Sequence, residues 1–203
     1  MARTRRRGSS LLLVALIAGV YFGSESLRTR IDMWRYPWAY AVGGRPTLPG
    51  TWVGTLATAG GLRSGVLLDL RLRPLSSGSR RRRSLWRSRN ATTLTANARM
   101  CDTRGEQVLT GAGSAQNKEG SRFHVNLSPA DSSKQPDGLA LSGIEGGWDG
   151  NNALAAQALP FWRERGASVV RSDDPNVKET PFAMTRASEE EYRAICRRFG
   201  AAR

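Results

Sequence analysis

An alternation of apolar and polar side chains with a period of two is the feature that most constrains how this chain can fold. Within residues 64–73, every second residue from Val66 to Leu72 is apolar. The four positions that alternate with these, from Leu67 to Arg73, include three charged residues. Residues 92–101 and 122–128 alternate in the same way. A period of two places successive side chains on opposite faces of a strand, whereas a helix repeats its apolar positions every three to four residues. These stretches therefore predict strands with one buried face.

Weaker candidates for strands are residues 51–58, 106–113, 138–144, 153–161 and 177–186. Turns rich in glycine, asparagine and aspartate separate them. About eight short strands joined in this way predict an all-β domain, an antiparallel up-and-down barrel or a sandwich. Many inward positions are alanine or glycine, which leaves two alternatives for the interior: a narrow, partly empty space or a small solid core.

One helix is predicted after the last strand, at residues 188–199. Ser188 with Glu191 three positions later forms a capping box, and glutamates at the start and arginines at the end suit the helix dipole. The apolar side chains share one stripe, which must pack against the rest of the fold. They are Tyr192, Ile195, Cys196 and Phe199.

The two cysteines of the chain, Cys101 and Cys196, are predicted to form a disulfide. Strand alternation sends Cys101 to the outer face of its strand, and Cys196 lies on the packing stripe of the helix. A helix docked on the outside of the barrel would bring the two together. An oxidising compartment favours the bond, and two unrelated free thiols are the alternative.

The N-terminal segment has the character of an export signal. Residues 1–7 carry four arginines and read as a cytoplasmic basic region, and the apolar run Leu11–Phe22 is 12 residues long. That length fits a signal peptide, while residues 8–27 together reach the ~20 residues that span a bilayer. The segment is therefore a signal anchor, a cleaved signal with a poor cleavage site, or a buried helix. By the positive-inside rule the remaining chain lies outside the cytoplasm, which predicts a single-pass protein of the bacterial cell envelope.

Residues 28–49 are predicted to be an aromatic juxtamembrane linker before a domain at residues 50–203. Trp34, Tyr36, Trp38 and Tyr40 alternate along it. These rings fit the lipid headgroup region, or alternatively pack on the domain. The proline- and glycine-containing residues 46–50 indicate a hinge into the domain.

Gly-x-Trp-x-Gly occurs twice, around Trp52 and around Trp148. With its meandering strands and C-terminal helix, the chain resembles the Gly-x-Trp β-barrels of the calycin type, the lipocalins and their avidin-like relatives. The resemblance implies that Trp52 closes one end of the barrel and that a basic residue late in the chain, here Arg186, packs over it. Since Asp149 to Asn152 form a hairpin turn, we expect Trp148 to pack at a second barrel corner.

The stretch at positions 80–89 is the most basic part of the surface. It is a candidate for binding anionic lipid headgroups or acidic glycans through arginine forks, with a tryptophan inserting or stacking; a solvated loop is the alternative. The predicted side of the membrane argues against nucleic acid. The candidate residues are Arg80, Arg81, Arg82, Arg83, Trp86, Arg87 and Arg89.

Neither a catalytic nor a cofactor motif is apparent. The net charge is +14, but arginine supplies nearly all of it, which an arginine-rich proteome explains without an acidic partner. The single histidine, His124, makes a histidine-centred metal site impossible, and the sequence offers it no evident nucleophile. We expect no cofactor, no metal site and no catalytic residue.

The function that these features favour is a membrane-tethered, extracytoplasmic, non-enzymatic binding domain for a small apolar ligand or an envelope partner. A structural subunit of an envelope complex is the alternative, and an enzyme is a third. A hollow barrel would favour the ligand, a filled barrel the structural subunit, and a cleft that gathers His124 with carboxylates the enzyme.

Overall fold

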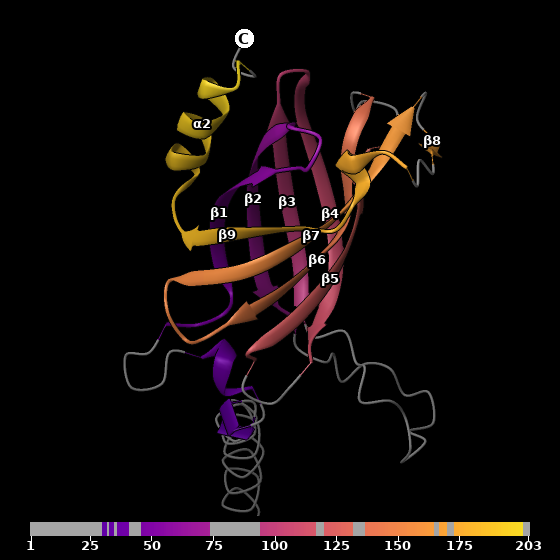
Figure 1. Ribbon diagram of the computed structural model, residues 1–203. Coiled ribbons are helices and arrows are strands. Elements are labelled where there is room, and N and C mark those ends of the chain that lie inside the picture. Colours follow the sequence, from indigo (N-terminus) through magenta and orange to yellow (C-terminus); the bar gives the residue numbers. More distant parts are fainter. Residues whose placement is uncertain are drawn as a thin grey trace, which may run out of the picture.

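The computed structural model describes residues 30–31, 33–34, 36–40, 46–73, 94–116, 120–131, 137–164, 167–169 and 173–200. Within these residues antiparallel strands dominate, with one α-helix near the C-terminus (Figure 1). The strands are β1 (Gly50–Ala57), β2 (Arg63–Leu72), β3 (Leu94–Asp102), β4 (Gly105–Ala115), β5 (Arg122–Pro129), β6 (Gly138–Trp148), β7 (Ala153–Glu164), β8 (Ala167–Val169) and β9 (Thr180–Arg186). The helices are the short 3₁₀ turns η1 (Pro37–Ala39) and η3 (Pro175–Val177) and the α-helix α2 (Glu189–Arg198).

Eight of these strands close into an up-and-down barrel. Strands β1 to β7 each pair with the next along the chain, β7 pairs with β9, and β9 pairs with β1, so the ring has no free edge. The short β8 pairs only with the end of β7. Closure gives every strand in the ring a paired neighbour on both sides. The predicted antiparallel up-and-down barrel is confirmed.

The strand boundaries differ from the expected ones by a few residues, and most at β6. This strand was expected to end at Ile144, but it continues to Trp148 after a shift in register between Leu141 and Gly143. Such a bulge interrupts the period of two on which the sequence prediction rests. Strand β8 was not expected, since three residues carry no periodicity.

The buried side chains of the described strands form one continuous cluster inside the barrel. The small residues that suggested an empty space lie opposite large ones. Leu94 pairs with Gly113 across β3 and β4, and Gly54 pairs with Met184 across β1 and β9. At these positions a large side chain faces a small one, which favours a solid core over an empty space.

The two ends of the barrel differ in polarity. We call the end where β1 begins and β9 ends the floor, and the opposite end the upper end. The floor holds buried aromatic side chains, among them Trp52, Trp38 and Trp148. Buried polar residues occur toward the upper end, at Thr58, Ser64, Asp102, Gln107, Arg163 and Thr180.

Two of the sequence predictions fall outside the described residues. The signal anchor at residues 8–27 is one, and the arginine-rich stretch from Arg80 to Arg89 is the other. Among the helices that the structure does describe, none has both the length and the apolar character needed to cross a bilayer.

Candidate functional site

The floor is organised around Trp52, which is fully buried. Its indole nitrogen donates a hydrogen bond to the carbonyl of Leu48 (3.0 Å). Arg186 lies opposite Trp52 across β1 and β9, and its guanidinium carbon is 4.5 Å from the centre of the tryptophan ring. The same guanidinium donates to the carbonyls of Pro49 (3.3 Å) and Thr47. Burial lowers the pKa of Arg186 below its usual value, yet an arginine remains charged, so a cation–π contact covers the ring.

The two Gly-x-Trp motifs need glycine for different reasons. Gly50 has a positive φ of 147°, and a Cβ there would lie 2.2 Å from Nη1 of Arg186. A Cβ at Gly146 would lie 2.4 Å from the ring of Phe123. The first glycine therefore makes room for the arginine over Trp52, and the second makes room for a core phenylalanine.

Trp148 lies at the second corner, next to the hairpin between β6 and β7. It is 6% exposed and belongs to the same core cluster as Trp52. Its indole nitrogen donates to the carbonyl of Asn151 (2.8 Å), and Asp149 accepts from the backbone of Asn151 (3.1 Å). Both tryptophans thus fix a chain reversal or a strand start, which is a structural task and not a ligand contact.

Parts of the segment before β1 pack against the barrel. Trp38 is 3% exposed and its carbonyl accepts a hydrogen bond from the backbone of Leu48 (2.8 Å). Leu48 is fully buried, although residues 46–50 were expected to form a hinge. Tyr36 packs edge-on against Trp38, whereas Trp34 is 71% exposed. The aromatic run therefore divides: one part packs on the domain and the other faces outward.

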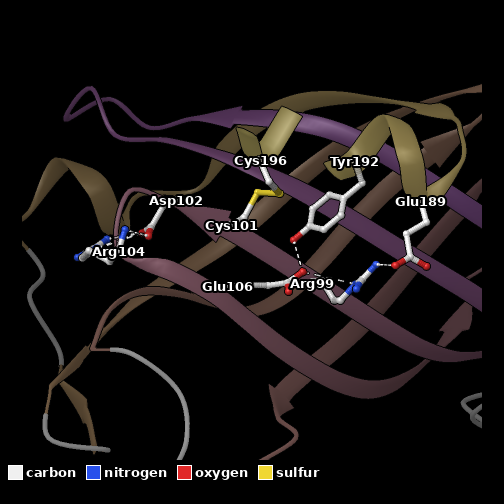
Figure 2. The surroundings of a disulfide bond; sticks show 8 residues. All are labelled: Arg99, Cys101, Asp102, Arg104, Glu106, Glu189, Tyr192 and Cys196. Atoms are coloured by element: carbon white, nitrogen blue, oxygen red, sulfur yellow. Dashed lines mark hydrogen bonds and ion pairs between the residues drawn. A yellow bond between two sulfur atoms is a disulfide. The ribbon is translucent and has the colours of Figure 1, made fainter. Parts of the chain in front are cut away.

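The outer wall carries helix α2, attached by the disulfide between Cys101 and Cys196 (Figure 2). Their Cα atoms are 5.7 Å apart, and the predicted bond is present. Around it lies a small apolar cluster separate from the core, in which Val53 and Leu67 of the barrel meet Tyr192 of the helix. The outward direction of Cys101 and the inward stripe of α2 bring the sulfurs together, as the sequence predicts.

Gly65 on β2 sets how closely the helix approaches. A Cβ at this position would lie 2.8 Å from the sulfur of Cys101 and 2.9 Å from Ile195. Sequence reasoning did not single out Gly65. Its position in a strand on the face that α2 covers is the signal that could have found it, since glycine inside a strand often marks a close approach.

A polar network borders the disulfide on one side (Figure 2). The Tyr192 hydroxyl donates to Oε1 of Glu106 (3.0 Å), and Arg99 forms an ion pair with Glu189 (2.9 Å). The guanidinium of Arg99 also lies 5.1 Å from the centre of the Tyr192 ring. Burial, followed by the charge of Glu106, raises the pKa of Tyr192. Hydrogen bonds from Arg99 and Arg193 lower the pKa of Glu189.

A groove of about 640 Å³ runs between α2 and the wall of β3 and β4. Among the described residues, Glu190 and Arg197 at its border form no ion pair, whereas Arg99 and Glu106 are already paired. The groove therefore offers one free carboxylate and one free guanidinium beside an apolar base. Its lining consists of Arg99, Cys101, Glu106, Glu190, Tyr192, Arg193, Cys196 and Arg197.

Sequence analysis did not predict this groove. Arg99 shares the outward face of its strand with Cys101, and the glutamates of α2 were assigned only to the helix dipole. The predicted disulfide was the available signal, because it implies that side chains next to either cysteine meet across the helix and the wall.

His124 lies on the outer face of β5, where both its ring nitrogens have partners. Nδ1 is 2.8 Å from Glu145 Oε1, and Nε2 is 2.9 Å from Asn126 Oδ1. Ser114 lies opposite His124 on β4, but the partners of the His124 ring are Glu145 and Asn126. Both ring contacts of His124 are thus to a carboxylate and an amide rather than to a hydroxyl nucleophile. In the described part of the chain, no three acidic, cysteine or histidine residues gather as metal ligands.

No protein family model matches the chain, and no curated protein matches it. One similar solved structure is "Structure of EF1p2_mFAP2b bound to DFHBI", with a TM-score of 0.43 and 14% sequence identity. The match covers 69% of this chain and 94% of that one.

Proposed function

We propose that this chain is a membrane-tethered domain outside the cytoplasm that binds a protein partner of the cell envelope and catalyses no reaction. The observation that carries the proposal is where the free space lies. The buried side chains inside the barrel form one continuous cluster, while a groove of about 640 Å³ lies on the outer wall beside α2.

The packed core favours an outside partner over an enclosed ligand. A small apolar ligand needs a concave, largely enclosed site that covers most of its surface. In this barrel Trp52, Leu68 and Leu70 are fully buried, and all three belong to the core cluster. A ligand inside would have to displace packed side chains, each displacement costing about 1–3 kcal/mol.

The chemistry of the groove fits a polypeptide. Its border carries carboxylates and guanidinium groups in similar number, so it lacks the single sign of charge that would select a polyanion such as nucleic acid. Glu190 can accept hydrogen bonds and Arg197 can donate them, and the disulfide with Tyr192 supplies an apolar base. Apolar surface bordered by both signs of charge is the usual composition of a protein interface.

The disulfide supports a compartment outside the cytoplasm, because structural disulfides persist in oxidising surroundings. The arginines of residues 1–7 and the apolar residues 8–27 support a tether with the barrel on the outer side. Anionic lipid or acidic glycan at the stretch Arg80–Arg89 remains part of the same proposal as a second, electrostatic contact.

Photo-crosslinking in intact membranes tests this function. A crosslinking amino acid replaces Glu190 in the groove, and the matched control replaces Ser128, which is exposed on β5 away from α2. We expect one discrete protein adduct from position 190, none from position 128, and loss of the adduct in Cys196→Ser.

The same preparation tests the alternatives. The chain should stay with the membrane after an alkaline wash and be accessible to protease only from the outer side. Two results together would contradict a protein partner and favour an interior ligand. No adduct would form at position 190, and native mass spectrometry would find a bound small molecule that leaves only on unfolding.

A further inference from the structure

The exposed large apolar side chains are concentrated in one short segment. Four are exposed in the described part of the chain, and three of them are Ile31 (39%), Met33 (38%) and Trp34 (71%). The fourth, Val108 (42%), lies on the outer wall of β4. Figure 1 shows the described residues between 30 and 40 beneath the floor, at the end of the barrel away from α2. Among the described residues, the segment below the floor therefore exposes more large apolar side chains than the wall does.

This segment is held against the barrel by Trp38. The ring of Trp38 lies against the backbone of Gly120, where a Cβ would come within 2.3 Å of it, and Gly120 has a positive φ of 70°. The backbone of Leu48 donates to the carbonyl of Trp38 (2.8 Å). Because Trp38 belongs to the barrel core, the exposed residues four to seven positions earlier are held near the floor.

A lipid bilayer is the surface that these residues fit. The apolar run Leu11–Phe22 ends only eight residues before Arg30. A tryptophan has an apolar body and a polar edge, and arginine is attracted to anionic headgroups, so Trp34 and Arg30 suit the interface between lipid and water. Ile31 and Met33 add apolar surface that lipid would cover.

We propose that the barrel stands upright on the bilayer, with Arg30, Ile31, Met33 and Trp34 in the headgroup region and the floor facing the membrane. The proposal rests on the tether of the proposed function, and adds to it a fixed orientation. Trp38 holds the membrane-facing segment against the barrel. The upper end and the groove beside α2 are then held away from the lipid, where a partner can reach them.

Site-directed fluorescence on the full chain in vesicles tests this orientation. The vesicles contain phosphatidylcholine with a minority of phosphatidylglycerol, and the native cysteines are paired, so a dye attaches only to an introduced thiol. Met33→Cys is compared with Val108→Cys, two positions of similar exposure. We expect lipids with brominated acyl chains to quench the dye at position 33 several-fold more than the dye at position 108.

Energy transfer to acceptors on the headgroups measures the height of each end. Asn152→Cys marks the floor hairpin and Ala59→Cys marks the upper hairpin, roughly 20 Å farther along the axis for a strand rise of ~3.3 Å and a tilt of ~35–45°. We expect stronger transfer from position 152, and a smaller difference between the two positions when Trp38→Ala is added to each.

The outcomes separate this inference from the proposed function. Equal quenching at positions 33 and 108, or equal transfer from positions 152 and 59, in protein that sediments with the vesicles would overturn the upright orientation and leave the tether intact. Protein that does not sediment with the vesicles would overturn the tether and the orientation together. The comparisons within the native background decide the question even if Trp38→Ala fails to fold.

Discussion

The floor of the barrel and its helix-covered wall are stabilised in different ways. At the floor, Trp52 and Trp38 are buried in the main core. Arg186 covers the ring of Trp52 and donates hydrogen bonds to two backbone carbonyls. On the wall, α2 rests on a small apolar cluster, and the disulfide and a few ion pairs add to it. The floor depends on extensive burial, whereas the wall combines a small apolar cluster with one disulfide and a few polar contacts.

This difference indicates which part of the molecule can change without unfolding. Local opening requires few buried apolar contacts, and α2 has few, because the apolar cluster beneath it is small. The floor residues belong to the same cluster as the rest of the interior, so disrupting them disrupts the barrel. We therefore expect that α2 can move, and the shape of the groove beside it can change, while the barrel stays folded.

The largest effect is expected at the floor. Trp52→Ala removes a fully buried ring, and we expect a loss of about 3–5 kcal/mol in the free energy of unfolding. Chemical denaturation followed by far-ultraviolet circular dichroism measures it. Trp34→Ala is the control, because its ring is 71% exposed and the expected change is below ~0.5 kcal/mol. Similar losses for both variants would contradict a floor held by burial.

The second effect concerns the disulfide. Cys196→Ser opens a cross-link between residues 95 positions apart, and we expect it to cost about 2–4 kcal/mol, the typical contribution of a disulfide. Reduction of the native protein should cost a similar amount. If Cys196→Ser and the doubly substituted protein with Cys101→Ser differ widely in their denaturation midpoints, the loss has another origin than the cross-link.

A third variant tests the arginine over the floor. Arg186→Met keeps much of the apolar stem and removes the hydrogen bonds to the carbonyls of Thr47 and Pro49, which predicts a loss of about 1.5–3 kcal/mol. Arg71→Met is the matched control, since its exposed pair with Asp69 contributes below ~1 kcal/mol. Thermal unfolding compares the two, and an Arg186→Met protein as stable as the control would refute the role of the guanidinium.

The smallest effect is expected at the wall. Tyr192→Phe removes one hydrogen bond to Glu106, worth about 0.5–1.5 kcal/mol. The raised pKa of Tyr192 also predicts a dependence on pH. The unfolded tyrosine ionises first, so this contribution is complete below about pH 10 and is lost as the pH rises above it. Denaturation midpoints from pH 8 to about pH 11 should fall less steeply in Tyr192→Phe, and identical slopes would contradict the prediction.

The sequence was sufficient for those parts of the fold that periodicity controls. Alternation along β2, β3 and β5 predicts the strands and the outward direction of Cys101, and the capping box at Ser188 predicts the start of α2. A bulge hides the end of β6, because one added residue reverses the alternation. The burial of Leu48 is equally hidden, since a leucine between two prolines gives no periodic signal.

The candidate site was harder to predict from the sequence. The disulfide follows from two directions that can be read along the chain, but the groove depends on how closely α2 approaches β2, which Gly65 sets. Likewise, only the tertiary structure shows that Trp38 packs under the barrel and Trp34 does not. The alternation of these aromatic residues is the same for both, and the contact with Gly120 distinguishes them.

Hydrogen exchange of the full chain in membranes, before and after reduction of the Cys101–Cys196 bond, tests the central contrast most directly. The account predicts that the amides of α2 lose protection on reduction, while those of β1 and β9 around Trp52 keep theirs. A loss of protection in α2 and in these floor strands to the same extent would contradict it, because the wall and the floor would then open as one unit.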